Sequence, residues 1–425
     1  NLFFIGSIIF TLAIVTRRML PTYLGTIILF LGYATAGTLM MDMETRWLAG
    51  LLDPFCDQAV EDAIRYWTPT EKNNLLLPIS GWVLLNRIIW VSIGIIFLLL
   101  GIKRFDFEHV SARSKKKKKL DKTVALPEIK PLGSYKPIFK RSTHWIQFNN
   151  KVLIEIRRAF LDPYFLGILA TAIVFIILNQ WAGYNVNGIK VLPVTDRVIS
   201  RLLGSINLFM LIIVIFYSGQ IIWKEKELKA DSILDAHPVP NWIPMLSKMI
   251  ALILIPAIIL FIVMILGVLI QTWFGFYDYE ISLYLKRLFL LKWTELILLC
   301  ILAFTVQTLV TNKYLGHFII ILYFLFGMFR GMLDLNHTLY FYGSGSGATY
   351  SDLNGFSPYL SRLFWYKLYW GSFAVFLALL SNLFWKRGLI GDIRSRLRKA
   401  IQRLTPILKY NLGLFIVLFI GAGSY

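Results

Sequence analysis

Apolar runs long enough to cross a membrane dominate this sequence and limit what it can fold into. A crossing helix needs about 20 mostly apolar residues. Runs of that length lie near residues 22–41, 80–101, 163–182, 202–222, 246–269, 288–309, 315–333 and 366–385, and shorter ones lie at 1–16 and 410–425. Helices satisfy their own backbone hydrogen bonds in lipid, and these runs lack the alternation of barrel strands. The sequence therefore predicts an all-α polytopic membrane protein with about eight complete and two partial transmembrane helices.

The amino-acid composition excludes an ordinary soluble enzyme. Of the 425 residues, 57% are hydrophobic and 16% are charged, whereas soluble domains carry about 25% charged residues. The net charge of +20 would suit a nucleic-acid binder. The charges lie in blocks between the apolar runs, however, so we expect no nucleic-acid partner. The two cysteines, Cys56 and Cys300, are too few for a disulfide framework or a cysteine zinc cluster.

The distribution of lysine and arginine predicts which loops face the cytoplasm. Residues 102–162 hold sixteen basic and six acidic residues, and residues 386–409 hold eight and one. Residues 42–80 hold three basic and seven acidic residues. By the positive-inside rule, the first two segments face the cytoplasm and the third faces outward. Counting crossings then predicts that 183–201, 271–287 and 334–363 lie outside and that 223–245 and 310–314 lie inside.

Two amphipathic stretches and a basic linker lie on the predicted cytoplasmic side. Apolar residues recur at helical spacing over 145–160 and 390–404, which is typical of helices in the headgroup layer or packed on a soluble partner. The linker is predicted to be flexible, and it either binds anionic lipid or acts as a solvated tether. The basic residues that we expect at the membrane surface are Lys115, Lys116, Lys117, Lys118 and Lys119 in the linker and Arg394, Arg396 and Arg398 in the second stretch.

An internal similarity of topology predicts two copies of a six-helix unit, the first lacking its start. Because the chain opens with Asn1 rather than methionine, we expect it to be the middle portion of a longer polypeptide. The predicted parts are three crossings of a first unit (1–105), the basic flexible cytoplasmic linker (106–142), a second six-crossing unit (143–388), a cytoplasmic amphipathic helix (389–408) and the start of a further crossing (409–425).

Motifs that carry chemistry are missing from the sequence. No G-x-x-x-x-G-K-[ST] phosphate loop, H-E-x-x-H zinc motif or G-x-S-x-G elbow occurs, and the five histidines are scattered. We therefore expect no catalytic residue, no metal site and no cofactor in this chain. Residues 352–355 superficially resemble a calcium loop, but the spacing of acids is wrong and a turn is the simpler interpretation.

Two charged pairs fall inside apolar runs. Lys292 and Glu295 lie one turn apart near the predicted outer end of their segment, and Arg330 and Asp334 are spaced i,i+4 near an outer boundary. Ionisable residues inside a membrane are functional candidates by default. Mutually neutralising anchors that reach the membrane surface are the simpler interpretation, and a proton relay is the alternative.

The connection after the apolar run at 202–222 carries the most information about function. It reads KEKELKADSILDAHPV over 224–239, a short charged helix that ends at a proline. This segment resembles the R-E-R-E-x-G-T-x-E-x-L-L-x-x-P-V pattern of type-2 ABC transporter permeases, although lysines replace the arginines. In that family the segment is a coupling helix that docks on the ATPase. The resemblance implies Glu225, Glu227 and Leu234 as ATPase-coupling residues and Pro238 as the helix stop.

Further runs give a closer likeness to bacterial permeases, common in Bacteroidota, that are fused to a C-terminal gluzincin-type zinc aminopeptidase domain. The similar runs are LDPFCDQAVEDAIRYWTPTEKN (52–73), LLNRIIW (84–90), YSDLNGF (350–356), YKLYW (366–370) and WKRG (385–388). The resemblance implies a multi-pass protein of the bacterial inner membrane. The peptidase is absent from this sequence, so its zinc is expected only in that absent domain.

The preferred hypothesis is a permease that moves an unknown substrate with ATP hydrolysed by separate subunits. It implies cytoplasmic ABC ATPase partners, in two copies and with their own ATP and magnesium, besides membrane lipids and possible further subunits. A membrane anchor or scaffold for an exported peptidase is the alternative. An ion-driven secondary transporter ranks last, because the polar residues lie towards the predicted ends of their segments.

Overall fold

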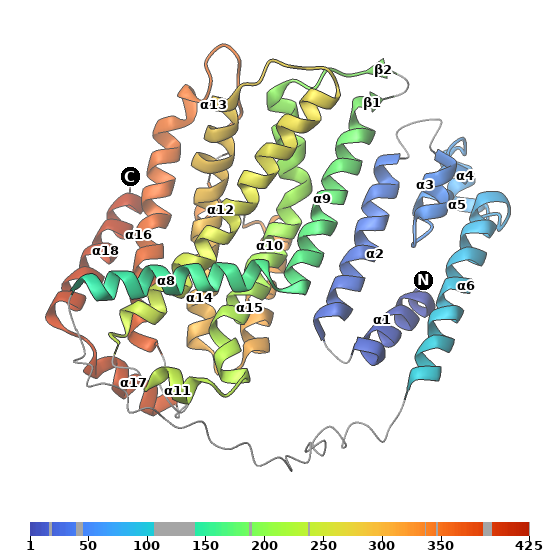
Figure 1. Cartoon of the computed structure of the whole chain (residues 1–425). Coiled ribbons are helices and arrows are strands. Elements are labelled where there is room, and N and C mark those ends of the chain that lie inside the picture. The colour runs from blue at the N-terminus through green and yellow to red at the C-terminus, as the bar shows by residue number, and fades with distance from the viewer. Residues whose placement is uncertain are drawn as a thin grey trace. The chain divides into compact units, whose positions relative to one another are not determined.

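The computed structural model of the chain describes residues 1–16, 19–39, 46–105, 141–186, 189–236, 239–335, 337–345, 347–385 and 393–424. Almost all of its regular structure is helical (Figure 1). It divides into two compact units, of which the first comprises 1–140 and 173–191 and the second 141–172 and 192–425. The linker lysines Lys115 to Lys119 lie outside the described residues.

The described residues of the first unit before the linker form six helices. They are α1 (Leu2–Thr16), α2 (Met19–Leu39), α3 (Arg46–Leu52), α4 (Asp57–Ala63), α5 (Pro69–Asn74) and α6 (Gly81–Arg104). Helix α1 packs on α6, where a Cβ atom at Gly94 would lie 2.9 Å from the Cα of Phe4. The Thr11 hydroxyl donates to the Phe97 carbonyl at 2.6 Å. In lipid, burial of apolar surface does not drive helices together, so helix packing depends on close contact and hydrogen bonds. The small residue and the polar side chain provide both between α1 and α6.

Two of the runs that carry the family likeness have a structural role in this unit. Asp53 is fully buried, and its carboxylate accepts hydrogen bonds from the backbone N–H groups of Phe55 and Gln58 at 2.8 and 2.9 Å. Asn86 on α6 is also fully buried and donates to the carbonyls of Gly50 and Asp53 at 2.6 and 2.8 Å. These bonds satisfy groups that the ends of α3 and α4 leave without helical partners.

The second unit is a bundle of long helices. Its elements are α8 (Arg141–Phe160), the start of α9 (Pro163–Tyr184), α10 (Thr195–Glu227), α11 (Asp231–Asp235), α12 (Trp242–Trp273), α13 (Ile281–Tyr284), the π-helix η1 (Leu285–Trp293), α14 (Thr294–Leu309), α15 (Lys313–Phe329), the 3-10 helices η2 (Arg330–Leu333), η3 (Thr338–Tyr340) and η4 (Ser357–Tyr359), α16 (Leu360–Phe384), α17 (Ile393–Gln402) and α18 (Pro406–Ser424). The rest of α9 and the antiparallel two-residue strands β1 (Asn185–Val186) and β2 (Ile189–Lys190) belong to the first unit.

Eight helices in the described parts are long and apolar enough to cross a membrane. The chain is an all-α multi-pass membrane protein, as the sequence predicts. These eight helices match the eight full-length runs predicted from the sequence except at one helix. The run at 410–425, predicted to be partial, forms most of the 19-residue helix α18 (Pro406–Ser424), which is among the eight. Helix α2, which covers residues 22–39 of the run at 22–41, is not. The run at 1–16 forms the shorter helix α1, as predicted.

Helix α10 forms the centre of the second unit. It packs against α12, α14 and α15, and 61% of its apolar window is buried, whereas α18 is buried nowhere along its window. Because α10 has 33 residues, it is about 50 Å long, some 20 Å more than the hydrocarbon layer. One or both ends of α10 therefore extend beyond the layer.

A proline inside α12 leaves a backbone carbonyl of this helix free to accept a hydrogen bond from a neighbouring helix. Pro256 has no N–H group, so the carbonyl of Leu252 loses its helical partner. The thiol of Cys300 donates to that carbonyl at 3.4 Å, and the indole N–H of Trp293 donates to the next one, of Ile253, at 3.1 Å. The proline thus joins α12 to the helix that contains η1 and α14.

The helix over 281–309 departs from its predicted position and from α-helical geometry. It begins at Ile281, whereas the apolar run predicts a start near 288. The apolar run starts later because the nine-residue π-helical segment η1 contains several polar residues. Glu295 therefore lies at the midpoint of this helix, and the prediction that it lies near the outer end is wrong. π-Helical segments are rare and are frequent at functional sites.

The amphipathic stretches form helices where the sequence predicts them. Helix α8 packs across α12 (Figure 1), and the second stretch forms α17, which begins at Ile393. The ends of α10, α14 and the start of α15 meet on the side of α17, since Arg396 of α17 donates to the carbonyl of Leu309 at 2.7 Å. Which face of this unit lies towards the cytoplasm stays a prediction.

Candidate functional site

The segment predicted to couple to an ATPase is divided into two elements. Residues 224–227 belong to the last turn of α10, and a turn with Lys229 in the left-handed region (φ +55°) separates them from α11. The prediction of one short helix over 224–236 is therefore wrong, because the apolar packing of α10 continues through Trp223 and carries the helix on to Glu227. Pro238 lies outside the described residues.

Both predicted coupling glutamates form salt bridges inside the protein. The carboxylate of Glu225 lies 2.7 Å from the ammonium of Lys248 on α12, and that of Glu227 lies 2.5 Å from the ammonium of Lys313 on α15. Lys248 is 3% exposed. These contacts assign the two acids to joining helices, a role that the resemblance does not imply.

A buried polar chain continues this arrangement into the bundle. The indole N–H of Trp223 donates to the side-chain carbonyl of Gln307 at 3.0 Å, and the Gln307 amide nitrogen lies 3.1 Å from Nδ1 of His317. Gly316 permits it, because a Cβ atom there would lie 2.4 Å from Gln307 Oε1. We call Trp223, Glu225, Glu227, Lys248, Gln307, Lys313 and His317 the helix-end network.

Apolar side chains of the connection remain exposed. Leu228 and Ile233 are each 69% exposed, and Leu234, a predicted coupling residue, is 37% exposed. Large apolar side chains at such exposure are the type that anchors a protein interface. In this structure these three apolar side chains are available to a partner together with Glu227, whose side chain is 47% exposed, whereas that of Glu225 is 26% exposed.

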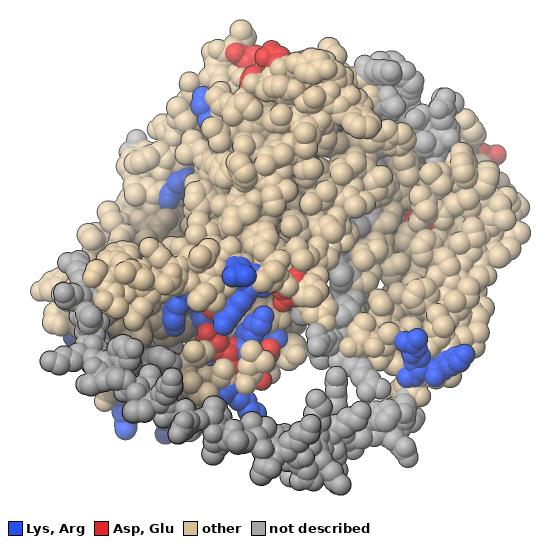
Figure 2. All heavy atoms as spheres, viewed as in Figure 1, with Lys and Arg blue, Asp and Glu red and all other residues tan. Residues whose placement is uncertain are grey.

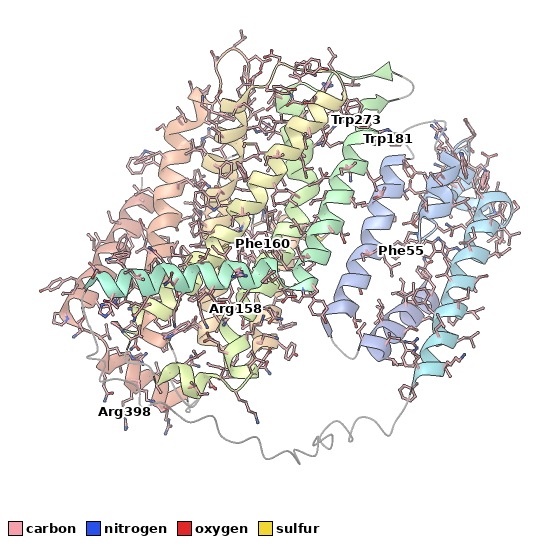
Figure 3. All side chains as sticks on the ribbon, in the orientation of Figure 1. Phe55, Arg158, Phe160, Trp181, Trp273 and Arg398 are labelled. Carbon is pink, nitrogen blue, oxygen red and sulfur yellow. The ribbon has the colours of Figure 1, made fainter. Side chains whose placement is uncertain are left out.

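The charged groups of this end gather beside α8 and α11 (Figure 2). Glu155 of α8 is 9% exposed and forms a 3.3 Å salt bridge with Arg158, which lies near the end of α8 with Phe160 (Figure 3). Burial raises the pKa of the Glu155 carboxyl, and the positive charge of Lys248 partly opposes the shift. This glutamate therefore holds a proton more firmly than an exposed one.

The basic residues of α17 have two different roles. Arg396 donates to the carbonyls of Leu309 and Thr308 at 2.7 and 3.1 Å, which caps the C-terminus of α14. Arg394 and Arg398 are exposed, and Arg398 lies on the opposite end of the bundle from Trp273 (Figure 3). The expectation of a membrane-surface role thus suits Arg394 and Arg398, whereas Arg396 packs within the unit.

A polar cavity lies at the other end of the same bundle. It has two lobes of about 380 and about 440 Å³, bounded by α10, the helix with η1 and α14, α15, α16 and the loop after η3. Residues that line both lobes are Asn207, Lys292, Glu295, Gly343 and Ser344. Volumes of this size are typical of small-molecule sites. We call it the polar cavity.

The loop that closes the polar cavity is fixed to three helices. The hydroxyl of Tyr323 donates to the carbonyl of Tyr342 at 2.7 Å, and the Tyr342 hydroxyl donates to the carbonyl of Leu298 at 3.1 Å. The indole N–H of Trp370 donates to the carbonyl of Ser344 at 2.8 Å. Tyr342 and Ser344 of the loop are therefore held against α15, α14 and α16.

Charged side chains line the polar cavity. Lys292 and Glu295 pair at 3.3 Å, which agrees with their predicted neutralisation, but they face the cavity, which anchors at the membrane surface would not do. Arg330 lies 5.9 Å from the centre of the Phe341 ring, and no salt bridge to Asp334 is formed. Asp334 has a left-handed backbone (φ +53°) beyond the end of α15, so the predicted i,i+4 spacing on one helix is wrong.

Sequence reasoning missed most of the polar cavity. Asn207, Arg287 and Lys367 line the cavity, but no motif surrounds them in the sequence, because each lies in a mainly apolar segment. The glycine-rich run at 343–348 was a possible signal. The turn at 352–355 is present, with a backbone bridge between Ser351 and Gly355, as predicted. No cluster of three metal-ligating side chains occurs among the described residues.

Comparisons with known proteins leave the family open. No protein-family model matches the chain, and no curated protein or solved structure is significantly similar to it. The resemblance to type-2 permeases therefore stays a prediction from the residues.

Proposed function

We propose that the chain is the permease of an ABC transporter in a bacterial inner membrane, powered by two separate ATPase subunits. The observation that carries the proposal is the connection of α10 to α11, which presents exposed Leu228 and Ile233 beyond a network that joins α10 to α12, α14 and α15. The chain has no phosphate loop of its own, so the nucleotide site belongs to a partner.

A movement imposed on α11 has a direct route to the polar cavity. Asn207 and Glu225 are both on α10, 18 residues apart, which corresponds to about 27 Å along the axis. Because salt bridges attach the end of α10 to α12 and α15, these helices move with it. The residues that line the cavity lie on α10, α14 and α15, so the arrangement supports alternating access by displacement of packed helices.

The test is co-purification of ATPase activity with the full chain from its native membranes in a mild detergent. We expect vanadate-sensitive ATP hydrolysis and a P-loop protein in the preparation. The double variant Leu228→Asp, Ile233→Asp should remove both. The matched control is Leu353→Asp, a 91% exposed leucine in the turn at 352–355, which should retain them. Equal ATPase activity in both variants would contradict the docking surface, and its absence from the wild type would favour the membrane anchor.

Exchange of the charges of Glu227 and Lys313 tests whether Glu227 contacts the ATPase or joins α10 to α15. Glu227→Lys alone should weaken the attachment to α15, and the added Lys313→Glu should restore it, because the pair is re-formed with reversed signs. Restored ATP hydrolysis in the double variant supports the internal role. If the exchange leaves the activity lost, Glu227 contacts the ATPase itself.

The position of Glu295 favours one second candidate, an ion-driven secondary transporter. This acid lies at the midpoint of its helix and faces a cavity, which is where coupling ions bind in such transporters. Substrate accumulation in vesicles distinguishes the two functions. An ABC permease needs ATP and tolerates loss of the proton gradient, whereas the second candidate stops when a protonophore is added.

A further inference from the structure

We infer that the polar cavity is a binding site for a phosphate-bearing amphiphile, with the phosphate between Lys367 and the glycine-rich loop and the apolar part against the leucines and aromatic residues. This inference rests on the proposed function for its role as the substrate site, whereas the binding itself requires no ATPase.

The balance of charge in the polar cavity favours an anion. Four basic residues and one acidic residue line its two lobes, namely Arg287, Lys292, Arg330, Lys367 and Glu295. Arg287 pairs with Asp196 outside the lining, and Lys292 pairs with Glu295. Arg330 and Lys367 remain without a salt bridge to any described residue, and a partly buried charge without a counter-ion is unfavourable.

Lys367 is the cation best placed for a ligand. It lies on α16 and is partly buried, and it forms no hydrogen bond or salt bridge with any residue that the structure describes. Asn207 on α10 faces the same space and is likewise unpaired within the described part of the chain. The helix-end network shows that charged groups of this protein are paired where they serve packing, so unpaired groups around open space indicate recognition.

Described loop residues at 343–345 and 347–348 line the same space. Gly343 has φ +75°, and the lining residues Gly343, Gly345, Gly347 and Ala348 carry no bulky side chain. The backbone N–H groups of Gly343 and Gly345 donate to no acceptor among the described residues. Backbone N–H groups beside a lysine form the usual phosphate-binding arrangement in proteins.

The remaining walls are apolar, which extends the ligand beyond a free anion. Leucines and aromatic side chains surround the charged part of each lobe, including Leu203, Leu298, Leu363, Tyr366 and Trp370 in one and Leu211, Leu296, Leu299, Phe324 and Phe341 in the other. A ligand that buries apolar surface here gains about 25 cal/mol per Å². The cavity therefore suits a molecule with both a phosphate and an apolar part.

The experiment measures binding to the purified full chain in a non-ionic detergent by titration calorimetry. The probes are dihexanoyl phosphatidic acid, inorganic phosphate and neutral dihexanoylglycerol. We expect phosphatidic acid to bind and dihexanoylglycerol not to bind. Binding of inorganic phosphate as well would show that the site also takes free phosphate, and its absence would show that the apolar part is required; both results support a phosphate site.

Three substitutions test the assignment. Lys367→Met should lower the affinity for phosphatidic acid at least about tenfold, because a charge-assisted hydrogen bond is lost. Lys367→Arg should retain most of the affinity. The matched control is Lys286→Met, an exposed lysine on η1 that does not line the cavity. Glu295→Gln should strengthen binding about threefold, because a repelling charge is removed.

The inference is wrong if phosphatidic acid and dihexanoylglycerol bind alike, if neither binds, if Lys367→Met matches Lys286→Met, or if Glu295→Gln weakens binding. These results are independent of the proposed function. Lys367-dependent binding in a preparation without ATPase would keep the site and reject the ABC permease, and ATPase co-purification without binding would do the reverse.

Discussion

The two ends of the second unit use the same residue types in opposite ways. In the helix-end network, Glu225 and Glu227 each have a lysine partner within 2.7 Å on another helix. In the polar cavity, Lys367 and Asn207 face open space and form no hydrogen bond with the described residues. Paired groups join helices, and unpaired groups at a cavity are available to a ligand. The difference separates residues that maintain the structure from residues that act.

Thermodynamic measurement on matched substitutions tests this difference most directly. Removal of one member of a buried pair leaves an uncompensated charge, which is costly. Removal of a group that has no protein partner leaves nothing unsatisfied. Each substitution in the helix-end network should therefore destabilise the fold more than the matching substitution in the polar cavity. The predictions below follow from the largest expected effect to the smallest.

Lys248→Met should have the largest effect. It removes the 3% exposed partner of Glu225 beside buried Glu155, so the free energy of unfolding should fall by about 3 kcal/mol. Lys292→Met at the polar cavity should lower it by at most about 1 kcal/mol, because Glu295 is half exposed. Thermal unfolding of both variants in detergent measures the difference, and equal losses would remove the contrast between the two ends.

Gln307→Leu and Asn207→Leu compare the stability contributions of a buried amide and of an amide that lines the polar cavity. Gln307 is fully buried and binds Trp223 and His317, so its loss leaves two polar groups unsatisfied and should destabilise by about 2 kcal/mol. Asn207→Leu removes an exposed amide with no partner in the described chain and should leave the unfolding midpoint within experimental error. A loss at Asn207 as large as at Gln307 would mean that the cavity amide is structural.

Arg396→Gln tests the same distinction within one helix. Arg396 caps the end of α14 through two carbonyls, whereas Arg398 is exposed two residues further along α17. Loss of the cap should lower the free energy of unfolding by about 1 kcal/mol, and Arg398→Gln should have almost no effect. Binding of the two variants to anionic vesicles gives the opposite order if Arg398 lies at the membrane surface.

The sequence predicted the class of fold well because apolar runs of about 20 residues have few other solutions. It placed the ends of helices less well. Helix α10 continues to Glu227, and the helix that contains η1 and α14 begins at Ile281. Tertiary contacts of Trp223 and the π-helix η1 carry helical structure through polar residues at these two places. Boundaries in such segments depend on partners that are distant in the chain.

The sites were predictable only in part, for the same reason. The segment after α10 could be singled out as a local run of charge, but its glutamates are paired with Lys248 and Lys313, which lie 23 and 86 residues away. The polar cavity collects Asn207, Lys292, Ser344 and Lys367 from four separate parts of the chain. No local pattern joins them, so their meeting could be found only in three dimensions.

The pH dependence of stability gives the smallest effect, and its sign is diagnostic. Burial raises the pKa of Glu155, so its contribution to stability is present below the unfolded pKa of glutamate and is lost as the pH rises through the higher folded value. Glu71 is the control with the opposite sign, because hydrogen bonds from Thr68 lower its pKa, and its contribution is lost as the pH falls. Thermal unfolding is measured between about pH 4 and about pH 8. Glu155→Gln should reduce the loss of stability towards high pH, and Glu71→Gln should reduce the loss of stability towards low pH. A wild-type decline towards high pH that Glu155→Gln leaves unchanged would show that the buried Glu155 carboxyl does not cause it.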